Sequence, residues 1–215
     1  MDHKSLSLLR KEYRNSQLNE SDLLPDPFQQ FNHWFQQALA AELPEPNAMT
    51  LATVNEDGHP SARIVLLKEM NSKGFVFFTN YQSRKGEELE KNPFGAIVFF
   101  WHELERQVRI EGKVEKISAE ESDNYFHSRP RDSRIGAIAS PQSKRIASRQ
   151  LLEDKFSALI AQTADSFIDR PIHWGGYVLI PQQIEFWQGR PNRMHDRLVY
   201  SLSDTGVWEQ FRVAP

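Results

Sequence analysis

Short β-prone runs joined by turn residues are the feature that most constrains the fold of this chain. Two such runs flank Asp57-Gly58 in MTLATVNEDGHPSARIVLLKEM, which is a strong hairpin signal, and NSKGFVFFTN adds another turn and strand. The segment FGAIVFFWHELERQVRIEGKVEKIS predicts two more strands, and GGYVLIPQQIEFWQG with RLVYSLSDTGVWEQFRVAP predicts a closing pair. Pro181 in this pair suggests a bulge or an edge strand. Antiparallel pairing follows from these short connections.

Segments with helical character lie between the strands. DPFQQFNHWFQQALAAEL offers Asp26 as an N-cap and Pro27 at the first helical position. SRKGEELEKNP is compatible with a helix up to its Asn-Pro pair, and SRQLLEDKFSALIAQTAD predicts a longer one. In SAEESDNYFHSRPRDSRIGAIAS, Ser118 and Glu121 form a capping box, and Pro130 divides two short helices. The chain is therefore predicted to be α+β, a barrel or sandwich of antiparallel strands with peripheral helices.

Missing motifs and missing cysteine exclude several classes of protein. GxGxxG and GxxxxGK[ST] are both absent, so any bound phosphate must be held by side chains. The absence of cysteine excludes disulfides and thiolate chemistry and favours a reducing compartment. With 26 Lys and Arg against 29 Asp and Glu, the chain has no bulk attraction for nucleic acid or anionic lipid. The polar N-terminus and the lack of a long apolar run predict a cytoplasmic protein without a membrane segment.

Two clusters of cationic and hydroxylic side chains are candidates for anion recognition. Each cluster alone is equally compatible with solvated surface charge, but two clusters on an acidic chain indicate two phosphate-bearing ligands or one ligand with two phosphates. Strict alternation along the strand predicts opposite faces for Arg63 and Lys68. The first cluster comprises Arg63, Lys68, Thr79, Ser83, Arg84 and Lys85, and the second comprises Tyr125, Arg129, Arg131, Ser133 and Arg134. Neutral hydrogen-bonding groups that fit beside them are Gln107, Gln142 and Ser143, although a plain polar loop also explains the last two.

The stretch EFWQGRPNRMHDR combines an aromatic ring with cationic side chains. Arg193 and His195 are two residues apart and share a face if the chain is extended, and Arg197 continues that set. With Trp187, which also fits simple core packing, they are suited to stack on and hydrogen-bond a flat heteroaromatic ligand. His195 has no second histidine or carboxylate at a metal-binding spacing, so no metal site is predicted.

A set of motifs occurs along the chain in this order: LRKEY, RIVLLK, FFTN, SRKGEELEKNP, ERQVRIEG, YFHSRPRDSRIGA, PQS, WGGY and IEFWQG...R.HDR. Together, and in this order, they closely resemble the motifs of the pyridoxine 5′-phosphate oxidase family. The resemblance runs from Leu9 to Pro215. It implies an FMN-binding split β-barrel over residues 26–215, an N-terminal arm over residues 1–25, and a homodimer with FMN at the subunit interface. The implied reaction oxidises pyridoxine 5′-phosphate or pyridoxamine 5′-phosphate to pyridoxal 5′-phosphate. Hydride passes from C4′ to flavin N5, and O2 is the electron acceptor that yields H2O2.

The resemblance also implies roles for individual residues. The implied FMN contacts are Arg63, Ile64, Val65, Leu66, Leu67, Lys68, Phe78, Thr79, Arg84, Lys85, Gln107, Gln142, Ser143, Trp187 and Arg197. The implied contacts to the substrate phosphate are Lys68, Tyr125, Arg129 and Ser133, and those to its ring are the catalytic pair Arg193 and His195. Arg10 and Tyr13 match a segment that closes over the substrate in relatives.

Two departures and two alternatives accompany the resemblance. Phe78 stands where some relatives have tyrosine, and Arg190-Pro191-Asn192 replaces a loop richer in glycine. One alternative is a split-barrel flavoprotein that acts on a different small heterocycle. The other is a non-catalytic carrier of flavin or pyridoxal phosphate with the same fold.

Overall fold

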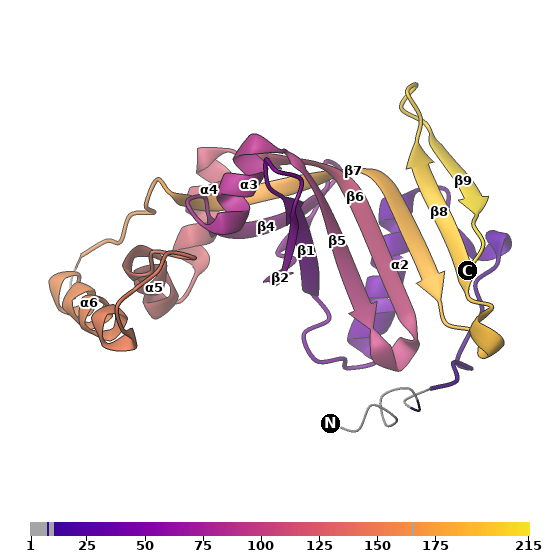
Figure 1. Cartoon of the computed structure of the whole chain (residues 1–215), viewed down its shortest axis with the longest axis horizontal. Helices are drawn as coiled ribbons and strands as arrows, with labels where there is room; N and C mark the ends of the chain where they lie inside the picture. Colours follow the sequence, from indigo (N-terminus) through magenta and orange to yellow (C-terminus); the bar gives the residue numbers. More distant parts are fainter. Residues whose placement is uncertain (1–7, 9–10, 165) are drawn as a thin grey trace. The chain divides into compact units, whose positions relative to one another are not determined.

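The computed structural model describes residues 8, 11–164 and 166–215 of the chain (Figure 1). It divides into two compact units, each built from separated stretches of sequence. Unit 1 contains the chain up to Met49, Ile97–Glu111 and Pro181–Pro215, and unit 2 contains Thr50–Ala96 and Gly112–Ile180. The division into an arm over residues 1–25 and one domain over residues 26–215 stays a prediction.

Nine strands of the described chain form one hydrogen-bonded sheet. Its order is β2-β1-β5-β6-β7-β4-β3, and in addition β8 pairs with β7 and β9 with β8. The registers of β3 with β4, β4 with β7, β7 with β8 and β8 with β9 are all antiparallel, as predicted. The strands are β1 (Ala48–Val54), β2 (Pro60–Leu66), β3 (Glu69–Met70), β4 (Phe75–Asn80), β5 (Phe94–Trp101), β6 (Arg106–Lys116), β7 (Trp174–Gln188), β8 (Asp196–Leu202) and β9 (Trp208–Arg212).

The predicted turn and helix signals are found where the sequence places them. Gly58 adopts a φ of +81° between β1 and β2, a conformation that glycine reaches without steric cost. The carboxylate of Asp26 accepts the backbone N–H of Phe28 at 2.7 Å, and Ser118 with Glu121 forms the capping box. The helices are α2 (Pro27–Ala40), α3 (Arg84–Lys91), α4 (Ala119–Ser128), α5 (Arg131–Ala139) and α6 (Arg149–Gln162), with 3₁₀ turns η1 (Glu20–Asp22), η2 (His102–Leu104) and η3 (Pro191–Arg193).

Strand β7 changes its partner along its length. Residues 174–179 pair with β4, and residues 183–188 pair with β8. Pro181 lies between these two ladders, where its missing N–H costs neither of them a hydrogen bond. Because β7 is flanked by β6 and β4 in the sheet order, Pro181 marks a change of partner and not an edge strand.

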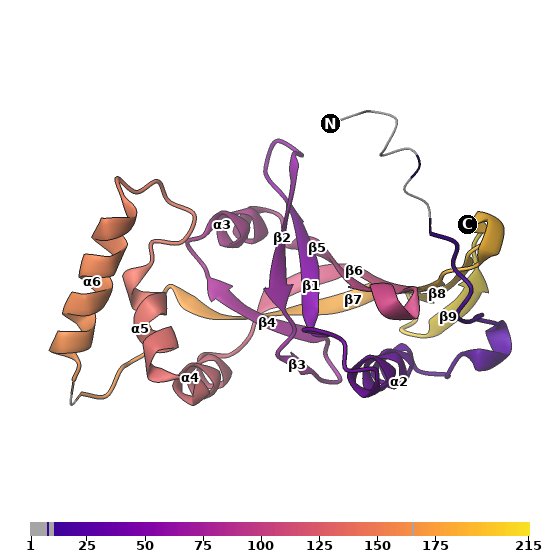
Figure 2. The same ribbon diagram turned by 90° about the horizontal axis from the view of Figure 1, so that it is seen from below.

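Each unit has its own aromatic core. In unit 1, Trp34 of α2 contacts Phe186 edge to face, with ring centroids 5.2 Å apart. In unit 2, Phe126 and Trp174 belong to a buried cluster between α4, α5 and the start of β7. Helices α5 and α6 of this unit lie side by side in both views (Figure 1, Figure 2). None of the helices in the described ranges is long and apolar enough to cross a membrane.

Candidate functional site

A cavity of about 690 Å³ in unit 2, called here the Arg63 cavity, brings the two basic clusters together. Arg63 of the first cluster and Arg129 of the second both line it. Lys68 lines the same cavity, so the prediction that Arg63 and Lys68 point to opposite faces is wrong. The reason is that β2 ends at Leu66, and strand alternation no longer applies at Lys68. The lining residues are Arg63, Ile64, Val65, Leu66, Lys68, Phe78, Thr79, Lys85, Tyr125, Arg129, Pro130, Ser133, Gln142, Ser143 and Trp174.

The ammonium group of Lys85 is buried in the wall of the Arg63 cavity, and its hydrogen-bond partners among the described residues are all neutral. Its Nζ donates to Thr79 Oγ1 at 3.1 Å, to Ser83 Oγ at 3.3 Å and to Gln142 Oε1 at 3.1 Å. Burial, and next the charge of Arg63, lower the pKa of Lys85 to about 8. A phosphate bound here would supply the negative charge that these partners do not.

A carboxylate behind the cavity wall orients Arg63. Nη2 of Arg63 lies 3.2 Å from Oε2 of Glu88, which also accepts the hydroxyl of Ser61 at 2.7 Å. Burial works against the ionised form, but hydrogen bonds from Thr53, Ser61 and two arginines outweigh it and hold the pKa of Glu88 at about 2. The second arginine, Arg84, donates from Nε to Glu88 at 2.8 Å, and it lines a different, smaller cavity.

Aromatic side chains also line the Arg63 cavity. The rings of Phe78 and Tyr125 stack with their centroids 3.8 Å apart. Phe78 therefore keeps a packing role although it lacks the hydroxyl of a tyrosine. The guanidinium carbon of Arg129 lies 4.6 Å from the ring centroid of Trp174. Nη1 of Arg129 is buried and has no hydrogen-bond partner among the described residues. An unpaired buried donor on a cation indicates a place for an anion.

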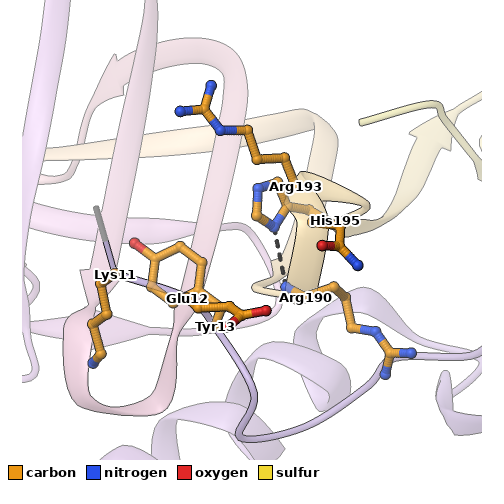
Figure 3. A pocket seen from close by; sticks show the side chains of 7 residues that line it. Lys11, Glu12, Tyr13, Arg190, Arg193 and His195 are labelled. Atoms are coloured by element: carbon orange, nitrogen blue, oxygen red, sulfur yellow. Dashed lines mark hydrogen bonds between the residues drawn. The ribbon is translucent and has the colours of Figure 1, made fainter. Parts of the chain in front are cut away.

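A second cavity of about 630 Å³, called here the His195 cavity, lies in unit 1 (Figure 3). The ring of His195 lies 4.6 Å from that of Trp187, and Tyr13 meets both rings nearly edge-on. The lining residues are Lys11, Glu12, Tyr13, Arg190, Asn192, Arg193 and His195. The aromatic and cationic groups of the EFWQGRPNRMHDR stretch are thus brought together, and the N-terminal segment joins them.

A backbone contact fixes the tautomer of His195. Its Nδ1 accepts the backbone N–H of Arg190 at 3.1 Å, the dashed line in Figure 3. In the neutral ring the proton therefore resides on Nε2. Burial, and next the charge of Arg193, lower the pKa of His195 below its ordinary value. A neutral imidazole with Nε2–H as its donor is the favoured form near pH 7.

The loop before β8 is turned, so the extended conformation on which a shared face of Arg193 and His195 was conditional is not adopted. Asn192 and Arg193 have φ values of 56° and 62°, in the left-handed region that favours glycine. Arg193 and His195 nevertheless line one cavity, because the η3 turn brings them together. Arg197 departs from this set: its Nε and Nη2 each lie 2.9 Å from a carboxylate oxygen of buried Glu185.

Several predicted site residues lie elsewhere, and several lining residues were not predicted. Arg10 lies outside the described residues. Trp174 has a visible signal, since it opens the WGGY motif at a strand start, and Glu88 stands four residues after Arg84 on one helix face. The predicted residues that line neither cavity are Leu67, Ser83, Arg84, Gln107, Arg131, Arg134, Trp187 and Arg197. The residues that sequence reasoning missed are Lys11, Glu12, Glu88, Pro130, Trp174, Glu185, Arg190 and Asn192.

Comparisons with known sequences agree along the whole chain. The family model described as pyridoxamine 5′-phosphate oxidase matches residues 35–162, and that of the pyridoxine 5′-phosphate oxidase C-terminal dimerisation region matches residues 174–215. The chain is 58% identical to the pyridoxine/pyridoxamine 5′-phosphate oxidase of a Cyanothece species, over 98% of this chain and 99% of that protein. It is also 58% identical to the protein of the same name from Burkholderia orbicola, again over 98% and 99%.

Solved structures share the fold. PhzG from Burkholderia lata, in complex with tetrahydrophenazine-1-carboxylic acid, superposes with a TM-score of 0.86 at 29% identity, over 92% of this chain and 98% of that one. An FMN-binding protein from Nostoc punctiforme, related to pyridoxamine 5′-phosphate oxidase, gives a TM-score of 0.69 at 18% identity, over 90% and 98%. The expected α+β split barrel with antiparallel strands is thereby confirmed.

Proposed function

Since this chain belongs to the pyridoxamine 5′-phosphate oxidase family, we propose that it oxidises pyridoxine 5′-phosphate or pyridoxamine 5′-phosphate to pyridoxal 5′-phosphate, with FMN as cofactor. When bound, FMN would supply the acceptor for the C4′ hydride and the route by which its two electrons, together with two protons, reach O2 to give H2O2. The protein supplies binding, orientation and charge. The observation that carries the proposal is the convergence of Arg63 and Arg129 on one cavity.

The donor set around Lys85 fits the phosphate group of FMN. Arg63, Thr79 and Lys85 present a guanidinium, a hydroxyl and an ammonium to the Arg63 cavity. Gln142 already accepts hydrogen bonds from Thr79 and Lys85, at 3.1 Å each, so these two donors converge on one point. A phosphate oxygen at that point would receive both bonds and neutralise the buried ammonium. Arg63 lines the same cavity, and Glu88 fixes its orientation.

The second anion position fits the phosphate of the substrate. Lys68, Tyr125, Arg129 and Ser133 line the Arg63 cavity together. The buried Nη1 of Arg129 has no protein partner among the described residues, and a phosphate oxygen would satisfy it. A cationic socket of this kind distinguishes a phosphorylated vitamer from its alcohol. It also favours such a substrate over a heterocycle without a phosphate, such as the carboxylic acid bound by PhzG.

Arg193 and His195 are proposed to hold the pyridine ring. The Nε2–H of His195 is free to donate to the 3-oxygen of the substrate, because Nδ1 is occupied by Arg190. Donation from a fixed nitrogen orients the ring and stabilises negative charge on that oxygen. Arg193 offers a planar guanidinium that stacks on a heteroaromatic ring.

We also propose that the active form is a homodimer in the cytoplasm. The C-terminal part of the chain matches a dimerisation region. Ile64, on the wall of the Arg63 cavity, is 65% exposed in the single chain, which is a high value for an isoleucine beside a binding site. A second copy of the chain would cover it. The absence of cysteine is in keeping with a reducing compartment.

An anaerobic titration tests the proposed activity. The purified protein, loaded with FMN, is mixed with pyridoxine 5′-phosphate without oxygen, and flavin absorbance is recorded. We expect bleaching of the flavin, recovery of its colour on admission of air, and no bleaching by unphosphorylated pyridoxine. A yellow protein that pyridoxine 5′-phosphate and pyridoxamine 5′-phosphate both fail to bleach would instead be a non-catalytic carrier.

A further inference from the structure

Trp174 occupies a central place in the wall of the Arg63 cavity. It is the first residue of β7 and is only 6% exposed, yet it contributes to the cavity lining. Its ring is nearly parallel to that of Phe78, at 16° and 5.6 Å, and to that of Tyr125, at 6° and 6.2 Å. Its carbonyl oxygen accepts a hydrogen bond from Nη1 of Arg170 at 2.6 Å, and this bond fixes the backbone from which the ring extends. The indole is therefore held in one orientation.

The two arginines of this cavity are held by different means. Arg63 has a buried carboxylate, Glu88, at 3.2 Å. No ion pair involves Arg129 within the described part of the chain, and its guanidinium lies over the indole of Trp174 at 4.6 Å and, more distantly, over Phe126 at 5.9 Å. Its buried Nη1 has no hydrogen-bond partner in the parts of the chain that the structure describes. The aromatic rings thus hold the guanidinium of Arg129 in place without neutralising its positive charge.

The physical consequence follows from what an aromatic face does to a cation. The ring quadrupole attracts a guanidinium that lies over it, and the indole is the best of the aromatic faces for this. An indole face accepts no conventional hydrogen bond, so the N–H groups in the guanidinium plane remain available at the ring's edge. A carboxylate in the same place would occupy two of those donors and cancel the charge.

We propose that Trp174 is a positioning residue for the substrate phosphate, because it holds Arg129 in place while leaving its charge and its N–H donors to the anion. The same ring aligns Tyr125 through their common stack with Phe78, so one side chain places two of the four proposed phosphate contacts. This inference rests on the proposed function. It assigns to Trp174 an effect on substrate affinity that is separate from FMN binding.

The test compares Trp174→Leu and Trp174→Phe with the wild-type enzyme. A cation–π contact in a desolvated site corresponds to about tenfold to thirtyfold in a binding constant. We expect Trp174→Leu to raise KM for pyridoxine 5′-phosphate by about that factor, with kcat changed less than about threefold and FMN retained. Inorganic phosphate should lose potency as a competitive inhibitor in parallel. Trp174→Phe keeps a weaker aromatic face, so its KM should lie between the values of the wild type and of Trp174→Leu.

Trp34 provides a matched control. It is 3% exposed and carries Arg106 over its ring at 4.4 Å, but it lines neither cavity. Trp34→Phe removes a comparable part of a buried tryptophan and weakens a comparable cation–π contact. It should lower the melting temperature while leaving KM for the substrate unchanged. A matching rise of KM in this variant would show a general effect of lost packing and would overturn the proposal.

A double-mutant cycle shows whether Trp174 acts through Arg129. In an Arg129→Ala background, the added Trp174→Leu substitution should change KM less than about twofold. An equal rise of KM in both backgrounds, or an unchanged KM in Trp174→Leu alone, would overturn the inference. Should Trp174→Leu fail to fold, the same cycle is run with Trp174→Phe. A wild-type protein that neither pyridoxine 5′-phosphate nor pyridoxamine 5′-phosphate bleaches contradicts the proposed function itself. Normal wild-type turnover with an unaltered Trp174→Leu variant contradicts only the role of Trp174.

Discussion

Nη2 of Arg63 lies 3.2 Å from Oε2 of Glu88, so a carboxylate buried behind the cavity wall fixes a cation that faces the cavity. Glu88 is held in its charged form by several donors at once, so it offers Arg63 a fixed anionic partner. Prearranged donors of this kind lose little conformational entropy on binding. This relationship gives Arg63 a role in cofactor affinity that is separable from turnover.

Arg63→Ala should weaken FMN binding more than it slows the flavin-loaded enzyme. The substitution removes a charge-assisted donor, worth about 1.5–3 kcal/mol, which corresponds to about tenfold to a hundredfold in Kd. Quenching of FMN fluorescence on titration with apoprotein measures the Kd. Arg63→Lys retains a charge and should show a smaller loss. Unchanged FMN affinity in Arg63→Ala would place the phosphate elsewhere.

Arg193→Ala should have the reverse effect. Arg193 lines the His195 cavity and has no part in the donor set around Lys85. We expect kcat/KM to fall by at least about tenfold, the value of one charge-assisted contact, with FMN affinity within about twofold of wild type. Steady-state kinetics at saturating FMN, with the same fluorescence titration, separate the two quantities. Equal losses of both in Arg63→Ala and Arg193→Ala would contradict this division of roles.

FMN affinity should decline as the pH rises above about 8. Burial lowers the pKa of Lys85 to about 8, so the free protein loses this cation in a range where the FMN phosphate keeps its charge. Binding that requires the ammonium weakens by up to about tenfold per pH unit above that pKa. Lys85→Arg keeps its charge throughout and should remove the slope. Equal slopes in Lys85→Arg and wild type would assign the effect to another group.

The same pKa shift has a consequence for stability. Between about pH 8 and the ordinary lysine value of 10.5, the unfolded chain binds the proton that the folded apoprotein has released. The contribution of Lys85 therefore raises the free energy of unfolding of the apoprotein as the pH rises across this window. Thermal unfolding of wild type and Lys85→Met, compared at pH 7.5 and 9.5, measures that contribution.

Activity should fall on the acidic side because of His195. Burial and the charge of Arg193 lower its pKa below 6.5, so the folded protein keeps the ring neutral while the unfolded chain already takes up a proton. Once the folded pKa is reached, Nδ1 is protonated and no longer accepts the N–H of Arg190. We expect kcat/KM to be level near neutral pH and to fall on the acidic side as His195 takes up a proton, and His195→Gln to be slower without this acidic decline. An unchanged acid limb in His195→Gln would assign it to another residue.

Gly189→Ala should disturb the N-terminal segment. A Cβ built on Gly189 would lie 2.7 Å from the ring of Tyr13 and 2.8 Å from its Cβ, which is closer than carbon atoms approach. Tyr13 must therefore move away from Trp187 and His195. We expect a rise in KM for the substrate of about tenfold, comparable to the loss of an aromatic contact and its alignment, with FMN affinity retained.

Tyr13→Ala is the companion to this substitution. It removes the side chain that Gly189→Ala displaces, so the two changes should not add when combined. Additive effects on KM would show that the added methyl group acts on another part of the molecule.

Local interactions explain which elements could be predicted from the sequence. The N-cap at Asp26, the capping box of Ser118 with Glu121, and the turn at Gly58 each involve residues only a few positions apart. The geometry of these hydrogen bonds depends on neighbouring residues and not on distant segments. The family motifs added the residue roles, which composition and spacing alone left open.

The sequence by itself determined that this is an antiparallel α+β chain with two cationic clusters and side chains suited to hold phosphates. Only the tertiary structure decided that Arg63, Lys68 and Arg129 share one cavity, that Arg197 pairs with Glu185, and that Trp174 lies beneath Arg129. The physical reason is that a side chain's environment depends on where distant segments meet. Strand alternation fixes which face a residue takes only while the strand continues, and β2 ends before Lys68.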